Sequence, residues 1–338
     1  MSPLGFETLL DALRGVGETT RLRILALLSE AELTVTDLTD ILRQSQPVVS
    51  RHLKVLNDAG VVERFREGSW AFFRLASGAP TAALVQSLVR HLDPADPVVT
   101  HDRERLMAVR TERANQAQEY FSNYAEEWDH LRSLHVPDDK VEQAIVDMVG
   151  SRAIPALLDI GTGTGRVLEL LGPQANRGVG IDLSREMLAI ARTKLTAAGL
   201  QQCGVQLGDL YDLPFAPNSF DVVVMHQILH LLDDASGAIT EAARVLKPGG
   251  RLLVVDFAPH AIEALRDQHA HRRLGFASDT VSAWMTAAGL EVPTERTITP
   301  DAGSDRIPVS LWLARDPRLA ATRTPLISRK PQLQGASL

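Results

Sequence analysis

The sequence contains a single cysteine, Cys203, among 338 residues. One thiol cannot form a disulfide within the chain, and it cannot supply the several thiolates of a cysteine-rich metal or arsenic site. No apolar run approaches the ~20 residues that a membrane-spanning helix needs, and the N-terminus lacks the basic start and apolar core of a signal peptide. We therefore expect a cytoplasmic protein with no membrane partner.

An excess of positive charge is also missing, because the formal net charge is -7. Binding to nucleic acid would therefore depend on a local basic surface, not on the charge of the whole protein. Hydrophobic residues make up 45% of the chain and charged residues 23%, as in globular proteins with a substantial core. The length predicts two domains with a connector between them.

The first 80 residues show the pattern of a winged helix-turn-helix. Residues 6–29 predict two helices separated by glycines, and a short helix follows over 36–43, with Thr36 as its cap and Thr34 as a turn residue. A turn at Gln44–Ser45 leads into a helix over 47–59, and "VVERFREGSWAFFRL" predicts a β-hairpin.

Segment 43–57 is basic and has no acidic residue, as a helix in the major groove of DNA requires. We expect Val48, Leu53 and Leu56 to face the core. An ordinary solvated amphipathic helix remains the alternative. The candidate DNA contacts are Ser45, Gln46, Val49, Ser50, Arg51, His52 and Lys54 on the helix, with Arg64, Arg66 and Arg74 on the hairpin.

Three stretches, "TTRLRILALL", "VVSRHLKVLNDAGVVE" and "REGSWAFFRL", resemble the ArsR/SmtB-type winged-helix repressors over roughly residues 6–76. The resemblance implies a homodimer that binds a palindromic operator in double-stranded DNA. That family places metal-binding cysteines where this chain has Thr34 and Thr36, and hydroxyls are poor ligands for a soft metal. We expect no metal site, and we interpret His91, His101 and Glu104 as surface residues of the connector.

The second half begins with "LLDIGTGTG" (157–165), an apolar strand that runs into three alternating glycines. Such a loop lets a ligand lie against the backbone, but by itself it fits a dinucleotide, a nucleoside or no ligand. Asp182 ends the next strand, 17 residues beyond Gly165, where a carboxylate can bind ribose hydroxyls. Asp159 would attract the cationic amino-acid end of a ligand and repel a pyrophosphate.

Five ordered motifs, "DIGTGTG", "GIDLS", "GDLYDLPF", "FDVVVMHQILHLL" and "RVLKPGGRLLVVD", resemble the class I S-adenosylmethionine-dependent methyltransferases over roughly residues 118–315. The resemblance implies an α/β, Rossmann-like domain with a seven-stranded sheet whose last strands are about 290–298 and 308–315. It also implies that S-adenosylmethionine is the cofactor and S-adenosylhomocysteine the product. The implied cofactor contacts are Asp159, Gly161, Thr162, Gly163 and Gly165 around the methionine part, Asp182 on the ribose, Asp209 and Leu210 at the adenine, Leu183 and Met187 packed on it, and His226 at the methyl end.

Candidate catalytic residues are His226 and His230, which follow the fourth strand, and Tyr124. Tyr124 lies in "EYFSNYAEEWDHL", where Tyr120, Phe121, Tyr124 and Trp128 are spaced to share a helical face, either to pack on the sheet or to meet the sulfonium. The segment around "LRDQHAHRRLGF" carries further basic residues that line an acceptor pocket, bind a metal or form polar surface. These residues are His260, His269, His271, Arg272 and Arg273.

We therefore predict a winged helix-turn-helix domain over 1–80, a helical connector or dimerisation segment over 81–117, a methyltransferase domain over 118–316 and a disordered tail over 317–338. The predicted function is a DNA-binding transcriptional regulator fused to a methyltransferase that acts on a small-molecule acceptor. The alternative is a repressor that senses S-adenosylmethionine or S-adenosylhomocysteine without turnover. A third possibility, an enzyme that uses the winged helix only to dimerise, is disfavoured by the acid-free helix.

Overall fold

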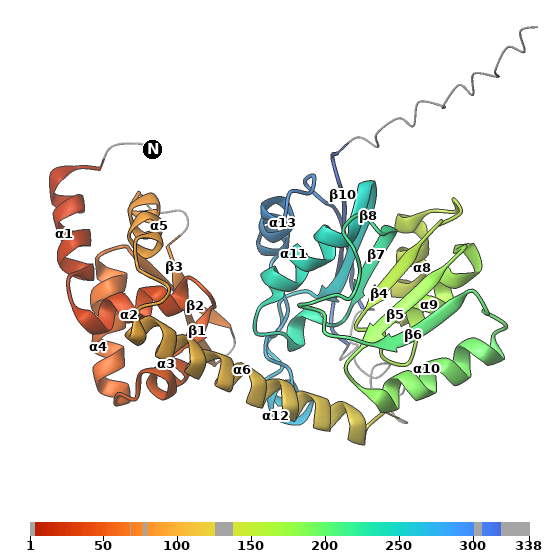
Figure 1. The fold of residues 1–338 in the computed structure, drawn as a ribbon, viewed down its shortest axis with the longest axis horizontal. Helices are drawn as coiled ribbons and strands as arrows, with labels where there is room; N and C mark the ends of the chain where they lie inside the picture. The colour runs from red at the N-terminus through yellow and green to blue at the C-terminus, as the bar shows by residue number, and fades with distance from the viewer. Residues whose placement is uncertain (1–3, 68, 77–79, 126–137, 301–305, 319–338) are drawn as a thin grey trace, which may run out of the picture.

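The computed structural model describes residues 4–67, 69–76, 80–125, 138–300 and 306–318. Figure 1 shows a smaller helical body at the N-terminus and a larger α/β body, with one long helix running between them. Within these residues, no helix is long and apolar enough to cross a bilayer. Residues 319–338 of the predicted tail (317–338) lie outside the described residues, as does Trp128.

The N-terminal body is a helix-turn-helix followed by a wing. Its two-residue strand β1 pairs with β3, which pairs in turn with β2 in an antiparallel hairpin. Its elements are α1 (Phe6–Val16), α2 (Thr19–Leu28), β1 (Leu33–Thr34), α3 (Val35–Leu42), α4 (Gln46–Asp58), β2 (Val62–Glu67), β3 (Trp70–Leu75) and α5 (Ala82–Arg90).

The start of α3 differs from the prediction by two residues. Thr34, not Thr36, is the N-cap: its hydroxyl accepts from the Asp37 amide (3.2 Å), and the Asp37 carboxylate accepts from the Thr34 amide (2.9 Å). This reciprocal pair satisfies two donors that a helix start otherwise leaves unpaired. Asp37 is therefore fixed at the entry of the helix that packs against α4.

The orientation of α4 corrects one predicted DNA contact. Val49 is fully buried and Val48 is 38% exposed, the reverse of our expectation. The reason is helical spacing, because Val49, Leu53 and Leu56 follow an i, i+4, i+7 pattern that Val48 does not fit. Val49 is therefore a core residue and cannot reach a base.

The predicted connector over 81–117 consists of α5 and a long helix that continues past residue 117. Asp96 caps α6 (Pro97–Asn123), and Pro97 takes its first position, where a proline is tolerated. Val85 of α5 and Leu106 of α6 are buried in the core of the N-terminal body. The connector is thus part of that body, and α6 extends from it to the α/β body (Figure 1).

The α/β body holds the predicted seven-stranded sheet, in the order β6-β5-β4-β7-β8-β10-β9. Strands β4 to β8 are parallel, and β10 runs antiparallel to both β8 and β9. The strands are β4 (Leu157–Ile160), β5 (Gly178–Asp182), β6 (Cys203–Leu207), β7 (Phe220–His226), β8 (Leu246–Phe257), β9 (Thr294–Ile298) and β10 (Val309–Arg315). The last two confirm the expected positions, and Cys203 opens strand β6.

Helices cover both faces of the sheet, because alternate residues of each buried strand point to opposite sides. On β7, Val223 and Met225 pack toward α11 and α13, while Val222 and Val224 pack toward α8 and α9. The helices are α8 (Asp138–Val149), α9 (Arg166–Leu171), α10 (Arg185–Ala197), α11 (Ala235–Val245), α12 (Ala264–Gln268) and α13 (Ser278–Ala287). The strand order reverses between β4 and β7, and open α/β sheets bind ligands outside the carboxyl ends of strands at such a point.

Candidate functional site

The glycine loop lies at this switch point, directly after β4. All three loop glycines have positive φ angles, which residues with a side chain rarely adopt: 69° at Gly161, 50° at Gly163 and 86° at Gly165. A Cβ on Gly161 would lie 2.8 Å from the Ile228 side chain, and one on Gly165 would lie 3.1 Å from Ala191. Gly161 therefore keeps the cavity wall open, whereas Gly165 lines neither cavity and permits close packing on α10.

Asp182, at the end of β5, is held in a fixed orientation beside this loop. Its two carboxylate oxygens accept from the backbone amides of Gly163 (2.8 Å) and Ser184 (2.9 Å). Burial raises its pKa above the ordinary value. The Leu183 amide also interacts with the carboxylate, and the acceptor positions that these amides leave remain for a sugar hydroxyl.

Asp159 is the buried carboxylate of the site. One oxygen accepts from the Thr162 hydroxyl at 2.6 Å, and the other has no hydrogen-bond partner among the described residues. Burial raises the pKa of Asp159 to about 7. A buried oxygen without a partner is costly unless a ligand supplies a donor. An ammonium group would do so, which fits the amino-acid end of S-adenosylmethionine.

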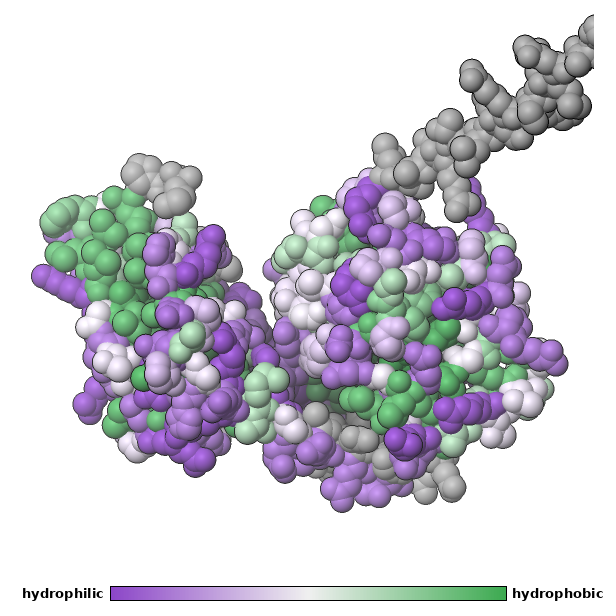
Figure 2. All heavy atoms as spheres, in the orientation of Figure 1, coloured by the Kyte–Doolittle hydropathy of each residue, from purple (hydrophilic) through white to green (hydrophobic). Residues whose placement is uncertain are grey.

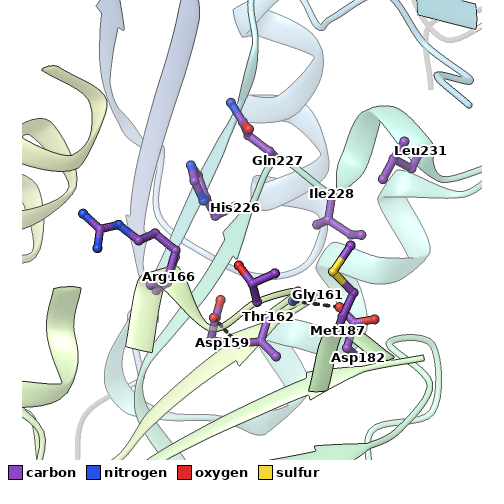
Figure 3. Close-up of a pocket in the computed structure, with 13 residues that line it drawn as sticks. Asp159, Gly161, Thr162, Arg166, Asp182, Met187, His226, Gln227, Ile228 and Leu231 are labelled. Atoms are coloured by element: carbon purple, nitrogen blue, oxygen red, sulfur yellow. Dashed lines mark hydrogen bonds between the residues drawn. The ribbon is translucent and has the colours of Figure 1, made fainter. Parts of the chain in front are cut away.

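Two adjoining cavities open over these residues and share Gly161, Asp182 and Ile228. The smaller, of about 80 Å³, includes Asp159, Thr162, Gly163, Met187 and His226 in its wall (Figure 3). The larger, of about 500 Å³, includes Leu183, Asp209 and Leu210. Apart from Gly165, the structure brings the predicted cofactor residues together. Met187, however, lines the smaller cavity and not the larger one, where Leu183 and Asp209 lie.

One wall of the larger cavity comes from the connector helix α6 and was not predicted from the sequence. Met107, Arg110, Thr111 and Arg113 of α6 line it opposite Asp209 and Tyr211. Nothing in the local pattern of α6 predicts this contact, because it depends on how the two bodies pack. Tyr211 belongs to the quoted motif "GDLYDLPF", and its side chain forms part of the wall.

Of the three predicted catalytic residues, only His226 lines a cavity among the residues described. His230 is 2% exposed, and its Nδ1 lies 2.8 Å from Asp256 Oδ1. Tyr124 is 42% exposed and packs against Tyr120, with 4.8 Å between ring centroids. His230 therefore helps to hold the loop after β7 in place, and neither it nor Tyr124 lines the two cavities.

The described residues of the basic segment after β8 line neither of the two cavities. Arg272 and Arg273 instead pair with acidic side chains of the N-terminal body: Arg272 with Asp37 (2.9 Å), and Arg273 with Glu32 (2.7 Å) and Glu67 (2.6 Å). Arg266 also pairs with Glu67 (2.9 Å), and its guanidinium lies 4.5 Å from the centroid of Trp70 in the wing. The tip of the wing is thus docked on the α/β body. No group of metal-binding side chains is present in the described parts of the chain.

The remaining candidate DNA contacts form an exposed surface on the N-terminal body. Ser45, Gln46, Ser50, Arg51 and Lys54 are exposed on or beside α4, as are Arg64 and Arg66 on β2. His52 is half-buried, 3.5 Å from Glu18. Arg74, by contrast, pairs with Glu63 at 3.1 Å and Glu32 at 3.6 Å, so it stabilises the wing.

The ionisation of Asp159 predicts a measurable effect on stability. The unfolded chain ionises this carboxyl near pH 4 but the folded protein only near pH 7, so the folded state loses stability as pH rises between these values. Asp159→Asn should remove that loss. The free energy of unfolding of the variant minus that of the wild type should therefore be roughly 2 kcal/mol larger at pH 8 than at pH 5, so the variant gains relative stability as pH rises. Urea denaturation at both pH values measures this, and an equal difference at both would contradict it.

Comparison with known proteins supports both halves of the chain. Residues 158–254 match the family model described as "Methyltransferase domain", and residues 18–64 match "Bacterial regulatory protein, arsR family". The ubiquinone/menaquinone biosynthesis C-methyltransferase UbiE of Desulfotalea psychrophila is 36% identical over 126 residues, which is 37% of this chain and 50% of that protein. The chain thus spans about half the length of this curated relative.

Solved structures support the fold of the second half. A chain from the complex between the Haloferax volcanii Trm112 methyltransferase activator and a methyltransferase aligns with a TM-score of 0.51 at 21% identity, covering 61% of this chain and 99% of that one. The cyclase SpnF aligns with a TM-score of 0.50 at 20% identity, covering 60% and 96%. Because one of these neighbours is named a cyclase, the fold alone does not fix the reaction. Together with the sequence matches, these findings show that the chain joins a domain of the bacterial ArsR regulatory family to a class I methyltransferase domain of the S-adenosylmethionine-dependent type.

Proposed function

We propose that this protein is a DNA-binding transcriptional regulator whose second domain transfers a methyl group from S-adenosylmethionine to a small molecule. The observation that carries the proposal is the donor set of the cavity. Asp159 offers an unpartnered carboxylate oxygen to an ammonium, and Asp182 offers fixed carboxylate oxygens to a ribose. Leu183 and Leu210 supply apolar surface beside Asp209 for a base. When bound, S-adenosylmethionine supplies an electrophilic methyl group.

His226 is the group that we assign to the acceptor. It is the last residue of β7 and lines the smaller cavity, between Arg166 and Gln227 in Figure 3. An imidazole in that position can take the proton of an acceptor hydroxyl, which makes the acceptor a better nucleophile. Because the curated relative is named a C-methyltransferase of ubiquinone and menaquinone biosynthesis, we propose a quinol-like acceptor.

A direct test uses methyl-labelled S-adenosylmethionine and naphthohydroquinone under anaerobic conditions. We expect labelled product and one S-adenosylhomocysteine for each methyl group transferred. Binding of the cofactor without any turnover of quinols or phenols would contradict methyl transfer to this class, and would favour the second candidate function, a sensor of S-adenosylmethionine or S-adenosylhomocysteine.

A buried ring of charges favours linkage between the cofactor cavity and the DNA reader, whichever function holds. Arg272 lies 2.9 Å from both Asp37 and Asp233, and Arg113 lies 3.1 Å from Asp233 and also donates to Asp37. Although burial opposes it, Arg272 and Arg113 lower the pKa of Asp37. Asp37 belongs to the capping box of α3, the helix that packs against α4, while Arg113 and Asp233 line the larger cavity. A ligand in the cavity therefore contacts two members of the ring.

The ring predicts that Arg272→Met uncouples the two sites. In the wild type we expect S-adenosylhomocysteine to change the affinity for operator DNA by about 5-fold or more, within the usual range of allosteric coupling. In the variant this ratio should approach one, while S-adenosylhomocysteine still binds, because Arg272 lines neither cavity. Fluorescence anisotropy of labelled operator with and without the ligand measures the ratio. An unchanged ratio in the variant would contradict the role of the ring.

We also propose that the regulator is a homodimer that acts on DNA in the cytoplasm. Helix α1 exposes three large apolar side chains, Phe6 (78%), Leu9 (36%) and Leu13 (44%). Figure 2 shows apolar surface gathered over this part of the N-terminal body. Exposed apolar patches of this kind support an interface with a second subunit.

A further inference from the structure

Gln227 has a backbone conformation that its residue type does not favour. It follows His226, the last residue of β7, and its φ angle is 53°. In this left-handed region a Cβ meets the following carbonyl oxygen, which makes the conformation unfavourable for residues other than glycine, asparagine or aspartate. The backbone amide is nevertheless bound, because it donates to the Val255 carbonyl at 2.7 Å. Such strain persists where surrounding structure enforces it, and it clusters at functional sites.

The side chain of Gln227 adds a second unfavourable feature. It is 6% exposed, and its amide nitrogen Nε2 is buried without a hydrogen-bond partner in the part of the chain that the structure describes. A buried donor without an acceptor lowers stability because it has lost its hydrogen bonds to water. The contacts of the Gln227 side chain do not offset the cost of the positive φ angle or of the unpaired amide. A ligand that accepts a hydrogen bond from this amide would restore the missing interaction.

The position of Gln227 indicates which ligand this is. In Figure 3, Gln227 and His226 lie at one side of the smaller cavity, while Asp159 and Asp182 lie at the other. The carboxylates of Asp159 and Asp182 are those that we assign to the cofactor. The side with His226 and Gln227 is therefore left for the second substrate.

The charge of the cavity limits the second substrate to uncharged molecules. Arg166 is the one guanidinium in the described wall of this cavity, and its Nε and Nη2 both donate to Glu142 at 2.7 Å. It is therefore already neutralised and is a poor partner for a carboxylate or phosphate. Ile228 and Leu231 supply apolar surface in the same wall. A hydroxylated ring without a charge fits this combination better than an anion.

We infer that Gln227 positions an uncharged, oxygen-bearing acceptor, such as a hydroquinone or phenol, beside His226. This inference rests on the proposed methyl transfer and adds a residue that selects the acceptor. Gln227 donates its amide hydrogen to one oxygen of the ring and thereby turns the reacting hydroxyl toward the His226 imidazole. The proton of that hydroxyl then passes to the imidazole. Gln227 is a positioning residue and takes no part in the proton transfer itself.

The first test is stability in the absence of any ligand, because a residue retained for binding should not be needed for folding. Gln227→Gly and Gln227→Ala both remove the amide, but only glycine relieves the positive φ angle. We expect Gln227→Gly to melt at or above the temperature of the wild type, and about 2–4 °C above Gln227→Ala. If both variants melt well below the wild type, Gln227 is a structural residue and the inference is wrong.

The second test is binding of naphthohydroquinone to the protein saturated with S-adenosylhomocysteine, by anaerobic calorimetry. We expect both variants to bind the probe at least 10-fold more weakly than the wild type and to bind S-adenosylhomocysteine within about 2-fold of it. Arg43→Gly is the matched control, since Arg43 has a φ angle of 55° in the N-terminal body. It should leave the affinity for the probe unchanged.

Two outcomes would overturn the inference. Probe affinities in both variants within 2-fold of the wild type would show that the amide does not contact the acceptor. No binding of the probe to the wild-type complex would show that the acceptor class is wrong. Absence of S-adenosylhomocysteine binding in the wild type is a distinct result, because it would remove the proposed function itself and this inference with it.

Discussion

Asp182→Ala should lower the affinity for S-adenosylhomocysteine by about 100-fold or more. The carboxylate is fixed by the amides of Gly163 and Ser184, so it can accept from ribose hydroxyls without paying for its own ordering. Hydrogen bonds to a charged group are each worth about 1.5–3 kcal/mol, and two of them correspond to the expected loss. The same carboxylate also holds the glycine loop, because it accepts from the Gly163 amide. Calorimetric titration of the full chain measures the affinity.

The control for this experiment is Asp279→Ala, which removes an exposed carboxylate from the first turn of α13. It should bind S-adenosylhomocysteine as the wild type does. Circular dichroism of both variants shows whether the fold is kept. An affinity of a folded Asp182→Ala protein within threefold of the wild type would refute the assignment of this cavity to the cofactor.

The paired substitution Arg51→Ala and Lys54→Ala should weaken binding to operator DNA by about 100-fold. Both side chains are exposed on α4, next to Ser50. Each contact from a basic side chain to a guanine or a phosphate contributes about 1–3 kcal/mol. In a homodimer both subunits lose these contacts. Since phosphate contacts release bound cations, the dependence of affinity on salt should become weaker as well.

The matched control removes two exposed arginines, Arg185 and Arg192, from α10 of the methyltransferase domain. This control changes the net charge by the same amount but leaves α4 intact. It should bind DNA nearly as the wild type does. If the two paired variants lose affinity equally, α4 is not the reader, and the winged helix would then act as a dimerisation module.

The cofactor residues were predictable because a parallel sheet fixes where its strand ends meet. The glycine loop after β4, Asp182 after β5 and Asp209 after β6 could each be placed from the order of strands alone. His226 was found by the same rule at the end of β7. What the rule does not give is the direction of side chains beyond the strand. His230 was therefore assigned to catalysis, although its Nδ1 lies against Asp256, away from the cavity.

The contacts between the two bodies were beyond the reach of local patterns. The place of Arg272 and Arg273 after β8 suggests an acceptor pocket, but their partners in the N-terminal body lie more than two hundred residues earlier in the chain. The role of α6 as a cavity wall has the same origin. Thr34 shows the smaller kind of error: the sequence offered two capping threonines, and the reciprocal bond with Asp37 decides between them.

The central claim is that one chain reads DNA with its first domain and binds S-adenosylmethionine with its second, and that the two events are linked. Footprinting the protein on its own promoter, with and without S-adenosylmethionine and S-adenosylhomocysteine, tests this claim most directly. We predict a protected palindromic site whose half-protection concentration shifts by about 5-fold or more when either ligand is added. A protected site whose half-protection concentration is the same with and without both ligands, or no protected site, would contradict it.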